Sequence, residues 1–107
     1  MKIPKKLKIG GRIFRVSLDD SIADTDRNAQ CLDGRIIYSE GKITLNSSVP
    51  RDRQEECFFH EIIHGAMDVC DLNTRLNRYD PNLAEDTVTA LSSILYQIFR
   101  DNRMLAE

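Results

Sequence analysis

The sequence predicts an α+β fold in which two β-hairpins are followed by two packed helices. Two observations lead to this prediction. Apolar residues recur with a period of two in the first half of the chain and at helical spacing in the second half. Glycine-containing turns interrupt the first half, whereas proline and capping residues precede the helical stretches. This order is typical of a small antiparallel sheet of three to four strands covered by helices.

Both predicted hairpins precede residue 47. Apolar and polar residues alternate from Lys5 to Leu18 around Gly10-Gly11, a pair that favours a tight hairpin turn. The second hairpin is expected to pair residues 35–38 with residues 42–46 through a turn at residues 39–41. Residues 19–30 between the hairpins are polar and acidic, and we expect a loop there with at most one helical turn.

Two amphipathic helices are predicted after the hairpins. The first spans about residues 51–70, and its apolar face consists of Phe58, Phe59, Ile62, Ile63, Ala66, Val69 and Cys70. Its flank and back carry Cys57, His60, Glu61, His64 and Asp68. After a polar loop at residues 71–80, Asp80-Pro81-Asn82 supplies capping residues and a first-turn proline for a second helix that runs to about Arg100. Its expected core face is Ala84, Val88, Leu91, Leu95 and Ile98.

Length and composition limit the class of protein. A chain of 107 residues forms a single domain, residues 1–107, that can bury a core without disulfides. The net charge of −2 argues against a general nucleic-acid or anionic-membrane binder, which would carry a basic excess clustered on one face. A small cluster of lysines near the N-terminus alternates with apolar residues and indicates a solvated strand face. Three widely spaced cysteines and the absence of a long apolar run lead us to expect a soluble, cytoplasmic protein.

The segment His60-Glu61-Ile62-Ile63-His64 matches the H-E-x-x-H pattern of zinc peptidases and contains both histidines of the chain. Histidines at positions i and i+4 of a helix point the same way and can bind one Zn²⁺. Glu61 follows the first ligand, so it is placed to act as general base on a zinc-bound water that attacks a peptide carbonyl. We therefore expect one zinc ion per chain. Two alternatives stay open: metal-free histidines on a helix surface, and a structural zinc site that also uses Cys57 or Cys70.

A third protein ligand is required, and no third histidine is present. Cys70 has the spacing of the longer H-E-x-x-H-x-x-G-x-x-H pattern, but the glycine of that pattern is missing. Among the carboxylates we prefer Glu85, which borders the core-facing stripe of the second helix, with Asp80 and Asp86 as alternatives. Asn82 and Glu85 also match a capping box, in which Glu85 would bond to its own helix N-terminus.

Three segments around these residues resemble a known family. Residues 59–66 (FHEIIHGA), 85–91 (EDTVTAL) and 95–102 (LYQIFRDN) resemble compact zinc metallopeptidase-like proteins of phages and prophages, distantly related to the ImmA/IrrE group of minimal gluzincins. The resemblance covers about half of the chain. It implies a zincin-like domain with His60, His64 and Glu85 as the zinc ligands.

The leading hypothesis is therefore a zinc-dependent metallopeptidase that acts on a protein or peptide substrate. The alternative is a non-catalytic, zinc-binding protein of zincin fold that acts by binding a partner, such as a repressor or a phage component. Neither a nucleic-acid nor a membrane partner is expected. We further expect residues 42–46 to form the sheet edge beside the metal and to hold extended substrate. Tyr38, Tyr79 and Tyr96 are candidate donors to a tetrahedral intermediate, with Tyr79 as the first candidate because it lies between the two predicted helices, but a packing role is the preferred interpretation.

Overall fold

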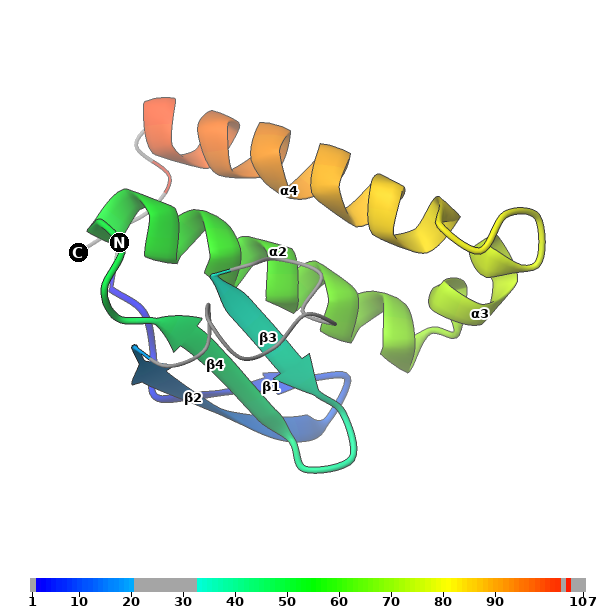
Figure 1. Ribbon diagram of the computed structural model, residues 1–107, viewed down its shortest axis with the longest axis horizontal. Coiled ribbons are helices and arrows are strands. Elements are labelled where there is room, and N and C mark those ends of the chain that lie inside the picture. Colours follow the sequence, from blue (N-terminus) through cyan, green and yellow to red (C-terminus); the bar gives the residue numbers. More distant parts are fainter. Residues whose placement is uncertain (1, 21–32, 103, 105–107) are drawn as a thin grey trace.

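The computed structural model describes residues 2–20, 33–102 and 104. Its elements are, in chain order, β1 (Lys6–Ile9), β2 (Arg12–Asp19), β3 (Gly34–Ile37), β4 (Lys42–Asn46), α2 (Arg51–Val69), α3 (Leu72–Asn77) and α4 (Leu83–Asp101). The α+β layout, with two hairpins before the helices, is confirmed (Figure 1). Most of the loop predicted at residues 19–30 lies outside the described residues, as does Cys31.

The four strands form one sheet in the order β1-β2-β4-β3. Both hairpins are antiparallel as predicted, and positive φ angles at Gly10 and Gly11 form the first turn. The central pair, β2 with β4, is parallel, so the sheet is mixed instead of wholly antiparallel. A parallel pair requires a long connection, which the chain between β2 and the second hairpin supplies.

The expectation that residues 42–46 form an edge strand is wrong. β4 pairs with β2 on one side and with β3 on the other, and its apolar residues Ile43 and Leu45 are fully buried. A strand with these two side chains in the core gains most from the centre of the sheet, where neighbours cover it on both sides. The edges are β1 and β3.

Helix α2 is the middle layer of the molecule, between the sheet and α4 (Figure 1). Toward the sheet it contributes Cys57 and Phe58 to a core with Ile9, Phe14, Ile43 and Leu45. Toward α4, Met67 packs with Ala84 and Val88 in a second cluster. None of the described helices is long and apolar enough to cross a bilayer.

Burial on two sides of α2 corrects the predicted apolar face. Ala66, Val69 and Cys70 are exposed, whereas His60, Glu61 and His64 are buried. A helix packed on two layers buries more than one stripe, and polar side chains enter the interior where partners are available.

The core face of α4 is also rotated from the predicted one. The buried residues are Ala84, Val88, Ser92 and Tyr96, whereas Leu91 and Ile98 are 43% and 39% exposed. Hydrogen bonds explain the burial of the two polar residues, because the Tyr96 hydroxyl donates to Glu55 Oε1 at 2.7 Å and Ser92 Oγ donates to the Thr89 carbonyl at 3.3 Å.

The polar loop predicted at residues 71–80 contains the short helix α3. It begins after Asp71, whose φ of 65° reverses the chain at the end of α2. Leu76 of α3 packs against the cluster between α2 and α4. The spacing of Leu72 and Leu76 by one helical turn was the overlooked signal.

Candidate metal centre

Helices α2 and α4 run in opposite directions, and the turn through α3 brings the start of α4 beside the middle of α2 (Figure 1). This arrangement unites His60 and His64 of α2 with Glu85 in the first turn of α4. One potential ligand atom from each of the three side chains lies within 4.8 Å of the other two. The three residues expected as ligands thus form one group that is within metal-binding distance.

The Glu85 carboxylate reaches both histidines. Glu85 Oε2 lies 2.7 Å from His64 Nε2, and Oε1 lies 3.2 Å from His60 Nε2. The two imidazole rings, one helical turn apart, are 4.8 Å between centroids and meet edge to face. Two ligands of one tetrahedral zinc ion are about 3.3 Å apart for bond lengths near 2.0–2.1 Å. The observed nitrogen–oxygen separations are therefore close to those that a shared ion requires.

Neighbouring side chains hold Glu85 in this position. The Thr89 hydroxyl, one turn along α4, donates to Glu85 Oε1 at 3.1 Å. Asn77 Oδ1 at the end of α3 accepts a hydrogen bond from the backbone N–H of Ala84 at 2.9 Å, which fixes the first turn of α4. Asn82 makes no side-chain capping bond, and the Glu85 carboxylate turns toward the histidines instead of its own helix N-terminus. The capping-box alternative is not the arrangement found here.

Burial sets the protonation states of the group. His60 and His64 are 5% and 2% exposed, and burial lowers the pKa of both, that of His64 to about 4. Both imidazoles are therefore neutral near pH 7, the state in which a ring nitrogen can bind a metal. Burial raises the pKa of Glu85. A cation placed against the carboxylate would lower that pKa again.

The atoms of the group fit a metal ion. His60 Nε2 is buried and lacks a well-formed hydrogen bond among the residues that the structure describes, and its polar neighbour is Glu85 Oε1 at 3.2 Å. A buried polar atom without a partner is costly, and a metal ion would remove that cost. Two imidazole nitrogens and one carboxylate form a donor set that suits zinc and related divalent metals.

Glu61 points to another side of α2, toward the sheet. It is 1% exposed, and its Cγ lies 3.5 Å from the position that a Cβ on Gly34 would occupy. Gly34 is the first residue of edge strand β3, and the same Cβ would lie 3.3 Å from Cys57. A glycine at this position thus allows β3 to approach α2 directly at Glu61. Glu61 is not part of the three-residue metal group.

Gly65 was not singled out from the sequence, although it directly follows the second histidine. A Cβ there would lie 2.7 Å from Ile9 Cδ1 and 3.3 Å from Ile36 Cδ1, so α2 packs closely on the sheet at this point. This contact fixes the rotation of the helix that turns His64 toward α4. A glycine inside an otherwise helical pattern was the available signal.

The remaining candidates lie away from the group. Asp80 and Asp86 are exposed, and Asp80 Oδ1 accepts a hydrogen bond from the Asn82 N–H at 2.8 Å. Of the described cysteines, Cys57 is buried against the sheet, and Cys70, which was expected on the apolar face of the helix, is exposed. Neither belongs to the metal group.

Tyr38, and not Tyr79, is the tyrosine near this centre. Tyr79 is 86% exposed, whereas the half-buried Tyr38 hydroxyl donates to the His64 carbonyl at 3.3 Å. Burial, with contributions from the nearby charges of Asp68, Glu61 and Glu85, raises the pKa of Tyr38 to about 12. Tyr38 therefore remains a hydrogen-bond donor throughout the neutral range.

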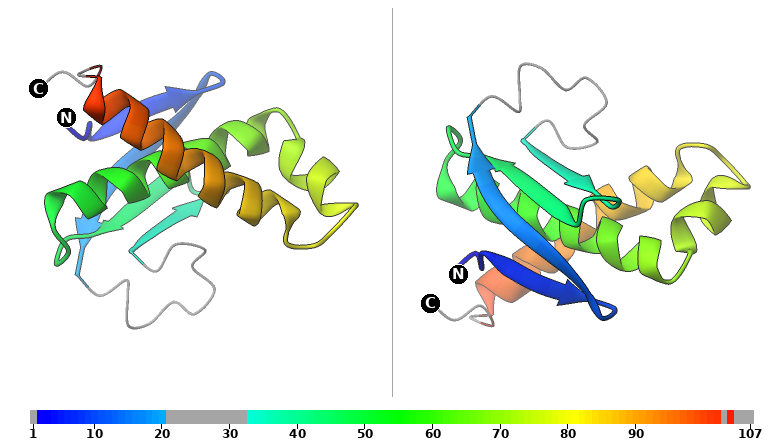
Figure 2. Two further views of the ribbon diagram at one scale, coloured as in Figure 1. Left: turned by 90° about the horizontal axis from the view of Figure 1, so that it is seen from above. Right: turned by 90° about the horizontal axis from the view of Figure 1, so that it is seen from below.

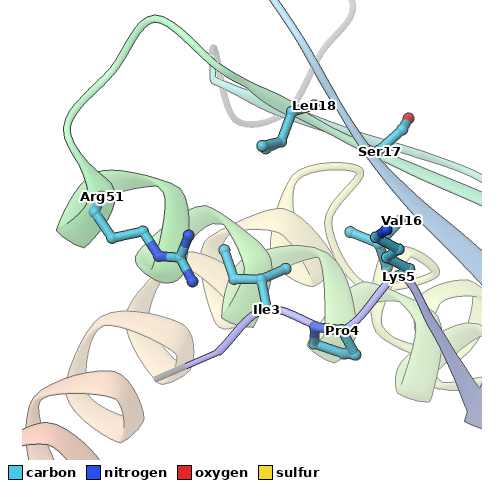
Figure 3. Close-up of a pocket in the computed structure, with 7 residues that line it drawn as sticks. All are labelled: Ile3, Pro4, Lys5, Val16, Ser17, Leu18 and Arg51. Carbon is cyan, nitrogen blue, oxygen red and sulfur yellow. The ribbon is translucent and has the colours of Figure 1, made fainter. Parts of the chain in front are cut away.

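A separate pocket of about 330 Å³ lies where the N-terminal segment, the end of β2 and the start of α2 meet (Figure 3). Its walls are Ile3, Pro4, Lys5, Val16, Ser17, Leu18 and Arg51. Since this lining contains no histidine, cysteine or carboxylate, the pocket is distinct from the metal centre.

Comparison of the chain with protein-family models, with curated proteins and with solved structures found no match.

Proposed function

We propose that the protein is a zinc-dependent metallopeptidase that hydrolyses a peptide bond with Glu61 as general base. The observation that supports it best is the meeting of His60 and His64 with Glu85, brought together from two helices. Glu61 is not one of the three residues of the metal group. This suits a general base, which acts on a water molecule beside the metal and does not bind the metal itself.

When bound, zinc supplies Lewis acidity that activates a water molecule and polarises a substrate carbonyl. The protein holds the ion through neutral His60 and His64 and through Glu85, and Thr89 keeps the Glu85 carboxylate oriented. Glu61 accepts a proton from the attacking water and passes it to the leaving amine.

For the substrate we propose an extended polypeptide that pairs with the outer edge of β3, which no other described strand occupies. This strand replaces the predicted β4, because β3 is the sheet edge that touches α2 at Glu61. Main-chain hydrogen bonds to a sheet edge bind extended peptides largely independently of sequence. Tyr38 follows β3 directly, and its hydroxyl is the tyrosine donor that lies at this edge.

One observation favours the alternative, a non-catalytic zinc protein that acts by binding a partner. The side chains of His60 and His64 are 7% and 2% exposed, and Glu61 is 1% exposed, so solvent reaches the group mainly at Glu85, which is 26% exposed. Closed sites are typical of structural zinc, whereas catalytic zinc keeps a position open for water.

The test combines metal analysis with an assay of peptide hydrolysis. We expect one zinc per chain in the wild type and none in His60→Ala. Glu61→Gln should retain zinc and fold but lose hydrolysis of a fluorescein-labelled casein, because an amide cannot accept the proton. Glu40→Gln, an exposed carboxylate in the β3–β4 turn, is the matched control and should leave hydrolysis unchanged. Activity in Glu61→Gln equal to wild type contradicts the proposed role, and zinc binding without hydrolysis by the wild type supports the alternative.

A further inference from the structure

We propose that the outer face of the sheet binds the phosphate backbone of a nucleic-acid duplex, independently of base sequence. Helix α2 covers one face of the sheet, and the view from below shows that none of the described helices covers the other (Figure 2, right). Four exposed cations project from this uncovered face: Lys6 and Lys8 of β1, Arg15 of β2 and Lys42 of β4. We call these four residues the basic face.

Strand register places three of these cations in one row. Lys6 is directly opposite Arg15, and Arg15 is directly opposite Lys42, on three adjacent strands. Adjacent strands are about 4.8 Å apart, so the row spans about 10 Å before the long side chains extend. The alternate positions, which face the core, are Leu7, Ile9, Phe14, Ile43 and Leu45. The direction of the basic side chains therefore follows from the pleat of the sheet.

Among the described residues, no carboxylate forms an ion pair with the basic face. None of its four cations lies within ion-pair distance of a carboxylate in the part of the chain that the structure describes. Residues 1–18 contain six lysines and arginines and no acidic residue. Asp19, the last residue of β2, is the acidic residue among the outward positions of the described strands. Like charges directly opposite one another destabilise a sheet, and a bound polyanion would reverse that cost.

Protection of a sheet edge accounts for only part of this pattern. Lysines on an exposed edge strand hinder pairing with other chains, which would explain Lys6 and Lys8 on β1. Arg15 and Lys42 lie on the two interior strands, whose edges are already paired. The net charge of −2 led us to expect no nucleic-acid partner, but clustering on one face is the relevant property, and the β2–β4 register creates it.

The other groups on this face favour phosphodiesters over a lipid surface. Ser17 and Thr44, directly opposite each other, add hydroxyl donors beside the cations, and hydroxyls with arginine and lysine are common ligands of nucleic-acid phosphates. Ile13 is the large apolar side chain that is exposed among the outward strand residues. Binding to a membrane surface is strengthened by several exposed apolar side chains, so this face suits a lipid surface less well. The outward strand positions carry no aromatic ring for base stacking, so the contact is to the backbone.

Fluorescence anisotropy with a labelled 20-bp DNA duplex of arbitrary sequence tests the proposal, with chelator present so that the result is independent of the metal centre. Four phosphate contacts give a log–log salt slope of about −3.6, which corresponds to about 100-fold weaker binding at 200 mM than at 50 mM salt. The triple variant Lys6→Glu, Arg15→Glu, Lys42→Glu should bind at least about 100-fold more weakly at 50 mM salt. If it does not fold, the corresponding triple glutamine variant should lower the slope by about 3.

The matched control changes the same number of charges elsewhere. Arg75→Glu, Arg78→Glu and Arg100→Glu combined lie on or beside α3 and α4 and should leave duplex binding within about threefold, because the contact is local. Equal loss in both triple variants would overturn the proposal, since it would show an effect of net charge alone. Absence of duplex binding at 50 mM salt would also overturn it, and so would binding to phosphatidylserine vesicles without binding to the duplex.

Discussion

The stability of the metal-free protein should fall steeply on mild acidification because of His64. Burial lowers the pKa of this histidine from 6.5 to about 4. The unfolded chain therefore takes up a proton near pH 6.5, and the folded protein does so only near pH 4. Protons bind preferentially to the unfolded chain between these two pH values. The contribution of neutral, buried His64 to the free energy of unfolding is therefore complete above about pH 6.5 and declines as the pH falls toward 4.

The size of the decline follows from the shift. A pKa unit corresponds to about 1.4 kcal/mol, and acidification from pH 7 to pH 5 covers part of the window, which gives a loss of about 2 kcal/mol. The lowered pKa of His60 adds to this loss. The raised pKa of Glu85 acts in the opposite direction, since that carboxyl binds its proton more readily in the folded protein. A change of about 2 kcal/mol is a substantial part of the stability of a small domain.

Urea unfolding at pH 7, 6 and 5 in the presence of chelator measures this effect, with far-ultraviolet circular dichroism as the signal because the chain contains no tryptophan. The wild type should lose about 2 kcal/mol more than His64→Gln over this range. The comparison removes the titration of other groups, which both proteins share. Parallel pH profiles of the two proteins would refute the reasoning and would mean that His64 is accessible to protons when folded.

Three further outcomes are expected. Glu85→Ala should weaken zinc binding by at least about 100-fold in calorimetric titration, whereas Asp86→Ala should not change it; the reverse result would identify the wrong carboxylate. Tyr96→Phe should lower the urea-derived free energy of unfolding by about 2 kcal/mol, because a buried carboxylate loses its hydrogen bond, and an unchanged value would mean that water replaces the hydroxyl. Gly41→Ala should cost about 2 kcal/mol in the same assay, because its Cβ would lie 2.8 Å from a backbone oxygen of β2; Gly11→Ala, also at positive φ but facing open space, should cost less, and equal losses would argue against this contact.

Local patterns in the sequence predicted the elements of the fold, whereas contacts between distant segments were less accessible. The spacing of His60 and His64 is a property of one helix, so their common direction could be predicted from a segment of five residues. The core face of α4 could not be predicted in this way. Tyr96 is buried because its hydroxyl bonds to Glu55 of α2, whereas apolar character alone predicts that Leu91 is buried. The position of β4 depends on pairing with β2, which no local pattern specifies.

The same limit applies to the candidate sites. Glu85 could be proposed from its place beside the core-facing stripe, but its contact with both histidines depends on the turn through α3, which was expected to be a loop. The row formed by Lys6, Arg15 and Lys42 depends on two strand registers and is invisible in the linear sequence.

The parallel pairing of β2 with β4 has a consequence for the order of folding. Each hairpin closes a short loop and can form early from its own residues, whereas residues 15–19 meet residues 42–46 only after a long stretch of chain has been closed. Helix α2 packs against β1, β3 and β4 and therefore bridges both hairpins. We expect the hairpins to be joined late, in the step that also docks α2, so that substitutions in the hairpin turns slow folding while those at the contact between β2 and β4 mainly accelerate unfolding.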